Sequence, residues 1–95
     1  MIIPLGEKKL PETCFIFKHS TSCPISSDAA DEVRSVEARH PIYWINVIEQ
    51  RGISDWVEDN YGIRHESPQL LLVENGAVSE SWSHTKIKRD LIVEK

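Results

Sequence analysis

Three short apolar segments constrain most strongly what this 95-residue chain can fold into. They cover residues 14–18, 42–48 and 69–74, and are rich in isoleucine, leucine, valine and aromatic residues. Each is nearly continuous rather than alternating between apolar and polar residues, a pattern typical of strands covered on both faces. Such strands need helices on both sides of the sheet, so we expect an α/β protein.

Helical segments are predicted between these strands and at the end of the chain. The first is expected from residue 24 to about residue 39, because apolar side chains recur there at helical spacing: Ile25, Ala29, Val33 and Val36. The second is expected over 53–61, with Ser54 as its N-cap and Gly62 as its C-terminal stop. The third is expected over 85–93.

The connections predict the topology. Asn75-Gly76 is a strong hairpin signal and leads from the segment 69–74 into a fourth strand over 77–82. The predicted order is β-α-β-α-β-β-α, with a parallel pair joined by a right-handed crossover, followed by an antiparallel hairpin. The length suits one domain over 1–95, with residues 1–12 as an N-terminal arm.

Charge and hydropathy exclude several classes of partner. The net charge is -4 and the lysines and arginines are scattered, which argues against nucleic-acid binding. No apolar run approaches the roughly 20 residues that a membrane span requires. Residues 1–11 lack the apolar centre of a signal peptide. We therefore expect a cytoplasmic protein with no membrane contact. We also expect it to be a monomer.

The chain has two cysteines, Cys14 and Cys23. Cytoplasmic thiols are kept reduced, and an extended strand beginning at Cys14 would carry it well away from Cys23. A disulfide between them is therefore not expected. Cys14 lies in an apolar strand and is predicted to be a buried structural residue.

Cys23 has a different setting, because it ends a polar loop over 19–22 and precedes Pro24. Proline fits the first position of a helix, so Cys23 is expected at a helix N-terminus. There the helix dipole and the free backbone N–H groups favour the thiolate, which is the nucleophilic form. Ser26 is expected close enough for its hydroxyl or N–H to reach the sulfur. Cys23 is thus the candidate nucleophile; the alternative is an inert buried thiol.

The string from Phe17 to Ser26, FKHSTSCPIS, resembles the monothiol bacilliredoxin family with its T-x-C-P-I-S signature. The similarity extends over about residues 15–91. It implies a thioredoxin-like fold with a four-stranded mixed sheet and helices on both faces. Family members carry a longer segment, including a helix, before the first strand; only about a dozen residues precede it here. The resemblance implies that Cys23 is catalytic and that its neighbours support it: Thr21, Ser22, Pro24, Ile25 and Ser26.

The resemblance also implies a cis-proline opposite the active cysteine, and Ser67-Pro68 stands directly before the strand at 69–74. The backbone of Ser67 would then pair with the peptide-like part of a bound thiol. The alternative is an ordinary trans-proline that begins a strand. His19, beside the Cys23 loop, could serve as a base or stabilise the thiolate. His65, near Pro68, could help to bind a small thiol. The alternative for His19 is a packing residue of the loop or the strand end.

The implied activity is thiol–disulfide exchange that removes bacillithiol, or a similar small thiol, from S-thiolated client proteins. Bacillithiol would be a co-substrate, with no permanently bound cofactor. The residues alone do not separate it from glutathione or coenzyme A. The alternative is a thioredoxin-fold binding module without redox turnover. Iron–sulfur relatives carry a C-G-F-S loop that Pro24 and Ile25 do not match. The histidines and cysteines lack metal-ligand spacing, so no metal site is expected.

Overall fold

The computed structural model of the chain describes residues 2–95. Its elements contain the predicted order, preceded by one additional strand. They are β1 (Ile2–Pro4), β2 (Cys14–His19), α1 (Pro24–Arg34), β3 (Ile42–Asn46), α2 (Arg51–Tyr61), β4 (Gln69–Glu74), β5 (Ala77–Ser83), the 3-10 helix η1 (His84–Lys86) and α3 (Arg89–Glu94). Within residues 2–95, no helix combines the length and the apolar character needed to cross a membrane.

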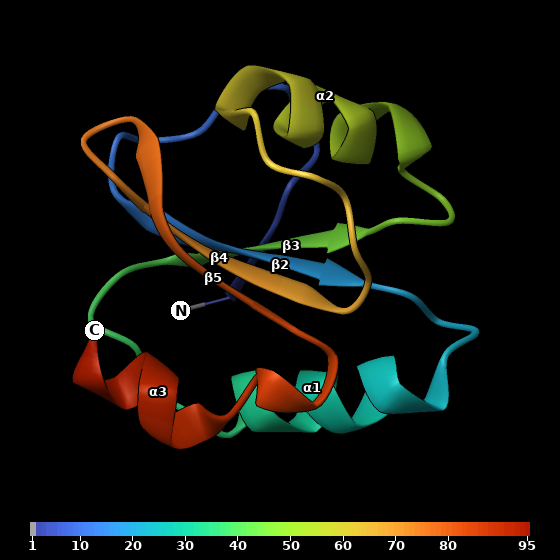
Figure 1. Cartoon of the computed structure of the whole chain (residues 1–95), viewed down its shortest axis with the longest axis vertical. Coiled ribbons are helices and arrows are strands. Elements are labelled where there is room, and N and C mark those ends of the chain that lie inside the picture. The colour runs from blue at the N-terminus through green and yellow to red at the C-terminus, as the bar shows by residue number, and fades with distance from the viewer. Residues whose placement is uncertain (1) are drawn as a thin grey trace.

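The strands form one mixed sheet in the order β1-β3-β2-β4-β5. β3 runs parallel to both β1 and β2, whereas β4 runs antiparallel to β2 and β5. Figure 1 shows α2 on one face of the sheet, and α1 and α3 on the other. The predicted α/β class with helices on both faces is therefore confirmed.

The central strand β2 is buried along its whole length, as its apolar sequence predicts. Successive side chains point to opposite faces of a strand, so β2 contributes to two cores. Phe15 and Phe17 pack with Val33 of α1 on one side of the sheet. Cys14 and Ile16 pack with Val57 of α2 on the other. By the same alternation, Lys18 faces α2 and His19 faces α1.

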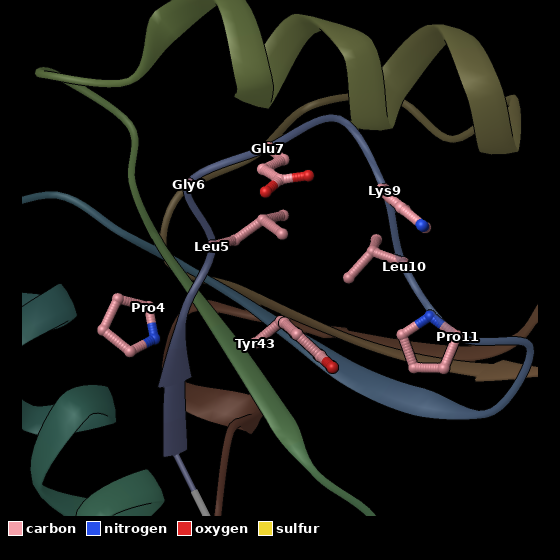
Figure 2. Close-up of a pocket in the computed structure, with 8 residues that line it drawn as sticks. All are labelled: Pro4, Leu5, Gly6, Glu7, Lys9, Leu10, Pro11 and Tyr43. Atoms are coloured by element: carbon pink, nitrogen blue, oxygen red, sulfur yellow. The ribbon is translucent and has the colours of Figure 1, made fainter.

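The N-terminal arm differs from the prediction, because its first residues form a strand. Ile2 pairs with Ile42, and the Leu5 N–H donates to the Trp44 carbonyl at 2.9 Å. The Leu5 side chain is buried, and the following residues run back across Tyr43 to border an open groove of about 490 Å³ (Figure 2). The expected four strands are therefore five. A three-residue strand is too short to show a periodic pattern.

The helix ends also differ from the prediction. α1 ends at Arg34 rather than near residue 39, with Ser35 as its C-cap. The Ser35 N–H donates to the Asp31 and Glu32 carbonyls, and the Ser35 hydroxyl donates to the Glu32 carbonyl as well. α2 begins at Arg51 with Gln50 as its N-cap, so Ser54 lies buried inside the helix. Gly62 ends α2 in the left-handed conformation, as predicted.

The C-terminal segment is a short 3-10 helix followed by α3, rather than one helix over 85–93. Ile87 and Ile92 are nevertheless both buried against the α1 side of the sheet. The hairpin before them has the predicted turn. Asn75 and Gly76 both have positive φ, 54° and 80°, as a type I′ turn requires.

Candidate active site at Cys23

Cys23 is the N-cap of α1, and its extended backbone (φ -113°, ψ 119°) leads the chain from the β2–α1 loop into the helix. Its N–H donates to the Ser20 carbonyl at 3.3 Å, and its carbonyl accepts the N–H of Ser27 at 3.1 Å. Pro24 occupies the predicted position at the start of the helix. The Cys23 side chain is half-buried and makes no capping hydrogen bond to the helix. Its thiol is therefore free and reachable at the end of a helix.

Ser26 does not serve Cys23 in the expected way. Its side chain is fully buried, with Oγ 2.8 Å from Nδ1 of His19 and 2.9 Å from the backbone nitrogen of Ser20. Among the described residues, no hydrogen bond joins Ser26 to the Cys23 sulfur. The expectation that Ser26 reaches the sulfur is therefore wrong. Its hydroxyl ties the first turn of α1 to the end of β2 and to the start of the loop instead.

His19 lies beneath the loop, stacked on Phe17 with ring centroids 5.9 Å apart. Burial, together with the nearby charge of Arg34, lowers the pKa of His19. The ring is therefore neutral near pH 7, where Nδ1 can share one hydrogen with the Ser26 hydroxyl. Its contact with the active loop runs through Ser26, which makes His19 a structural support of that loop.

The remaining predicted neighbours of Cys23 lie at the surface. Thr21, Ser22 and Pro24 are exposed, and the hydroxyls of Ser20 and Ser22 lie 3.3 Å apart. Ile25 is an apolar side chain with 43% of its surface exposed. It directly follows Cys23 and Pro24, where the helix begins. An exposed apolar group next to a reachable thiol offers a contact for another protein.

The second predicted part of the site precedes β4. The Ser67–Pro68 peptide bond is cis, which is the isomer that the family resemblance implies. The antiparallel pairing of Lys18 with Gln69 brings the end of β2 and the start of β4 together, so the loops carrying Cys23 and Pro68 lie at the same end of the sheet (Figure 1).

A cavity of about 330 Å³ lies between α1 and the segment 84–88. Ile25, two residues after Cys23, lines it on one side, and His84 lines it on another. The His84 N–H donates to the Pro68 carbonyl at 3.0 Å. The Cys23 loop and the Pro68 loop therefore lie at the same end of the sheet, and His84 contacts the second of them.

Lys18 is the residue that the sequence reasoning missed. Its side chain is fully buried, and Nζ lies 3.2 Å from the Ser54 carbonyl oxygen and 3.1 Å from Nδ1 of His65. The signal in the sequence was a lysine directly after the apolar run that ends at Phe17. His65 belongs to the loop before Pro68, as expected, but its ring turns to Lys18 on the α2 side. Its expected role in binding a small thiol stays a prediction.

Cys14 is a buried structural residue, as predicted. It lies at the start of β2 in the core on the α2 side, and both cysteines are free thiols. Burial raises the pKa of Cys14 to about 11, so its thiol stays protonated near pH 7. Cys14 therefore offers no second thiolate to Cys23.

The groove bordered by the N-terminal arm does not belong to this site, since neither the Cys23 loop nor the α2–β4 loop lines it (Figure 2). Across residues 2–95, no group of three or more histidine, cysteine, aspartate or glutamate side chains is placed to hold a metal ion.

Comparison with known proteins adds three findings. A family model described as monothiol bacilliredoxin BrxC matches residues 4–92. A solved structure described as a candidate oxidoreductase with a thioredoxin fold superposes with a TM-score of 0.84 at 26% identity, covering 98% of this chain and 91% of the other. The crystal structure of thioredoxin from Aeropyrum pernix superposes with a TM-score of 0.61 at 15% identity, covering 86% of this chain and 70% of the other, a likeness of fold alone.

Proposed function

The chain belongs to the monothiol bacilliredoxin family, and on that premise we propose that Cys23 removes bacillithiol, or a closely similar small thiol, from mixed disulfides on client proteins. The observation that carries the proposal is the placement of one free, half-buried cysteine at the N-terminus of α1, at the end of the sheet that also holds the loop of Ser67 and Pro68. Ser26, three residues after Cys23, has its hydroxyl engaged by His19 and Ser20.

The proposed reaction consists of two exchanges. In the first, the Cys23 thiolate attacks the small-thiol sulfur of the client's mixed disulfide. A disulfide forms between Cys23 and the small thiol, the old disulfide breaks, and the client leaves as a thiolate that takes a proton from water. In the second, the thiolate of another small-thiol molecule attacks the adduct. This step releases Cys23 as a thiolate and forms the symmetric disulfide of the small thiol.

The burial of Cys14 supports this two-step scheme. Cys14 faces the α2 side of the sheet inside the core, and the high pKa of its thiol keeps it protonated. An intramolecular disulfide with Cys23 therefore does not form in the folded chain, and the adduct on Cys23 waits for an external thiol. The client has already left reduced in the first exchange, and Cys14 takes no part in either step.

Intact-mass analysis tests the proposal. The wild-type chain is incubated separately with the disulfides of bacillithiol, glutathione and coenzyme A, and the adducts are mapped by peptide mass. We expect one adduct per chain, on Cys23, formed fastest with bacillithiol. The Cys14→Ala variant should give the same adduct and the Cys23→Ala variant none.

Turnover separates an enzyme from a binding module. A bacillithiolated client peptide is incubated with the protein and excess bacillithiol, and release of the free peptide thiol is followed. We expect many peptides released per chain, and only background release with Cys23→Ala. A Cys23→Ala variant that still released the peptide at the wild-type rate would overturn the proposal. A wild-type chain that bound the peptide without releasing it would favour the binding module.

A further inference from the structure

Lys18 is a charged side chain buried between the sheet and α2. None of its surface is exposed, and its burial lowers the pKa of Lys18, opposed by the charges of Glu58 and Asp55. Burying a lysine among apolar residues costs free energy unless its ammonium group is hydrogen-bonded. The proposed exchange chemistry makes no use of Lys18, so the burial of this charged side chain needs a separate explanation.

The partners of the Lys18 ammonium define the state of His65. An ammonium group has donors only, so Nδ1 of His65, 3.1 Å away, must accept the hydrogen bond. The neutral ring therefore carries its hydrogen on Nε2. The hydroxyl of Ser54 lies 3.3 Å from the same Nδ1, and the Ser54 carbonyl accepts a second hydrogen bond from Lys18. His65 itself is exposed, so its ring closes the cluster towards solvent.

These contacts hold the α2–β4 loop, residues 62–68, which carries Ser67 and Pro68. The His65 N–H donates to Glu58 Oε2 of α2 at 2.6 Å. The side-chain amide of Gln69 donates to the Arg64 carbonyl at 3.0 Å. Gln69 is also the strand partner of Lys18. The Lys18 contact thus joins the central strand to a loop that is also hydrogen-bonded to α2 through Glu58 and to β4 through Gln69.

We propose that Lys18 is a positioning residue that acts through His65 to hold the α2–β4 loop where Ser67 can pair with the mixed disulfide, and that protonation of His65 releases this hold. The inference rests on the proposed function, because it assigns the loop its part in binding the client's mixed disulfide. Lys18 and His65 do not touch the reacting sulfur atoms in this scheme.

Protonation of His65 puts a hydrogen on Nδ1, opposite an ammonium group that can only donate, so the hydrogen bond is lost and two positive charges face each other. Burial and the charge of Lys18 lower the pKa of His65. Three carboxylates act in the opposite direction: Asp55 and Glu58 on α2, and Glu66 in the loop. Arg51 of α2 borders the same cavity as His65. The hold is therefore intact above the ordinary histidine pKa of 6.5 and is lost as the pH falls through the lowered pKa of His65.

The test compares two rates on the same protein at pH values from about 8 to about 5. One is thiol exchange with a peptide in mixed disulfide with bacillithiol. The other is alkylation of Cys23 by iodoacetamide, which reacts with the same thiolate but does not pair with the α2–β4 loop. The ratio of the two rates removes the thiolate fraction and any effect of His19 on the Cys23 loop. We expect this ratio to fall about tenfold on acidification in the wild type.

Three variants assign the effect. His65→Gln keeps an acceptor for Lys18 but does not titrate, so its ratio should stay constant with pH. Lys18→Met keeps the volume of the side chain without the donor, and its ratio should be about tenfold lower at every pH. His40→Gln is the matched control, because His40 lies near Phe15, away from this cluster, and should keep the wild-type profile.

The outcomes separate the inference from the proposed function. A wild-type chain with no exchange on the peptide contradicts the proposed function. Exchange with a His65→Gln profile that falls as steeply as the wild type overturns the inference alone, even if Lys18→Met fails to fold. A nitrogen-15 spectrum of neutral His65 with the hydrogen on Nδ1 would overturn it as well, whereas the Nε2 form supports it.

Discussion

The Ser26 hydroxyl lies 2.8 Å from Nδ1 of His19, and this contact joins the first turn of α1, directly after Cys23, to the end of the central strand. The same oxygen lies 2.9 Å from the backbone nitrogen of Ser20. Ser26 is thus part of the support beneath the loop that carries Cys23. Loss of the Ser26 hydroxyl should therefore reduce the stability of the fold more than it reduces the reactivity of Cys23.

Ser26→Ala should destabilise the fold by about 1–3 kcal/mol, because the buried Ser20 N–H and the His19 ring both lose a partner. Urea unfolding followed by tryptophan fluorescence measures this loss. The matched control is Ser27→Ala, at an exposed position on the same helix, which should change the free energy of unfolding by less than about 0.5 kcal/mol. Equal stability of the two variants would show that the His19–Ser26 contact contributes nothing.

Alkylation should distinguish the two cysteines sharply. At about pH 7 the folded chain should take one iodoacetamide label, on Cys23, because Cys14 is buried and its pKa of about 11 keeps the thiol protonated. In urea the chain should take two labels. Peptide mass mapping identifies the sites, and Cys14→Ala should label at the wild-type rate. Rapid labelling of Cys14 in the folded state would contradict the buried position of this thiol.

The fold should lose stability in acid, in part through His19. Its pKa in the folded state lies below the ordinary value of 6.5, so the unfolded chain takes up a proton first as the pH falls. The stabilisation is full above about pH 6.5 and is lost as the pH falls through the lowered pKa. Urea midpoints at several pH values measure the slope. His19→Asn should make the slope of stability against pH shallower. An unchanged slope would show that His19 does not contribute to the loss of stability in acid.

Replacing two glycines by alanine should change the stability of the fold in opposite directions. Gly76 has φ of 80° in the hairpin turn, so Gly76→Ala should cost about 1–2 kcal/mol through backbone strain alone, since a Cβ there would meet nothing within 4 Å. Gly52 lies within α2 and also has open space around it. Gly52→Ala should stabilise the fold by about 0.5–1 kcal/mol. Thermal melts of the two variants would contradict this if both shifted in the same direction.

The parts of the fold that followed from the sequence are those with strong local signals. β2 and β4 are nearly continuous apolar runs, and Asn75-Gly76 strongly favours the type I′ turn that it forms. β1 was missed because three residues carry no periodicity, and its pairing with β3 is a tertiary contact. The end of α1 was misplaced because it depends on the hydrogen bonds of Ser35, while Val36 continues the apolar spacing beyond it.

The candidate site divides in the same way. The position of Cys23 follows from its neighbours in the chain, a polar loop before it and Pro24 after it. The hydrogen bond between Lys18 and His65 joins residues 47 positions apart, and no local pattern predicts it. The hydrogen-bond partner of the Ser26 hydroxyl could not be predicted either, because whether the hydroxyl turns to the Cys23 sulfur or to His19 depends on how the loop packs.

The short strand β1 also affects how copies of this protein meet one another. β1 covers one border of the sheet with only three residues and ends at Pro4, which has no N–H to offer a further strand. On the opposite border, the β4–β5 pairing shifts register at Leu72/Val73, and Glu80 of β5 forms an ion pair with Lys95. Shortness, proline, irregularity and charge all discourage open sheet borders from joining. This small sheet is thereby protected against edge-to-edge aggregation.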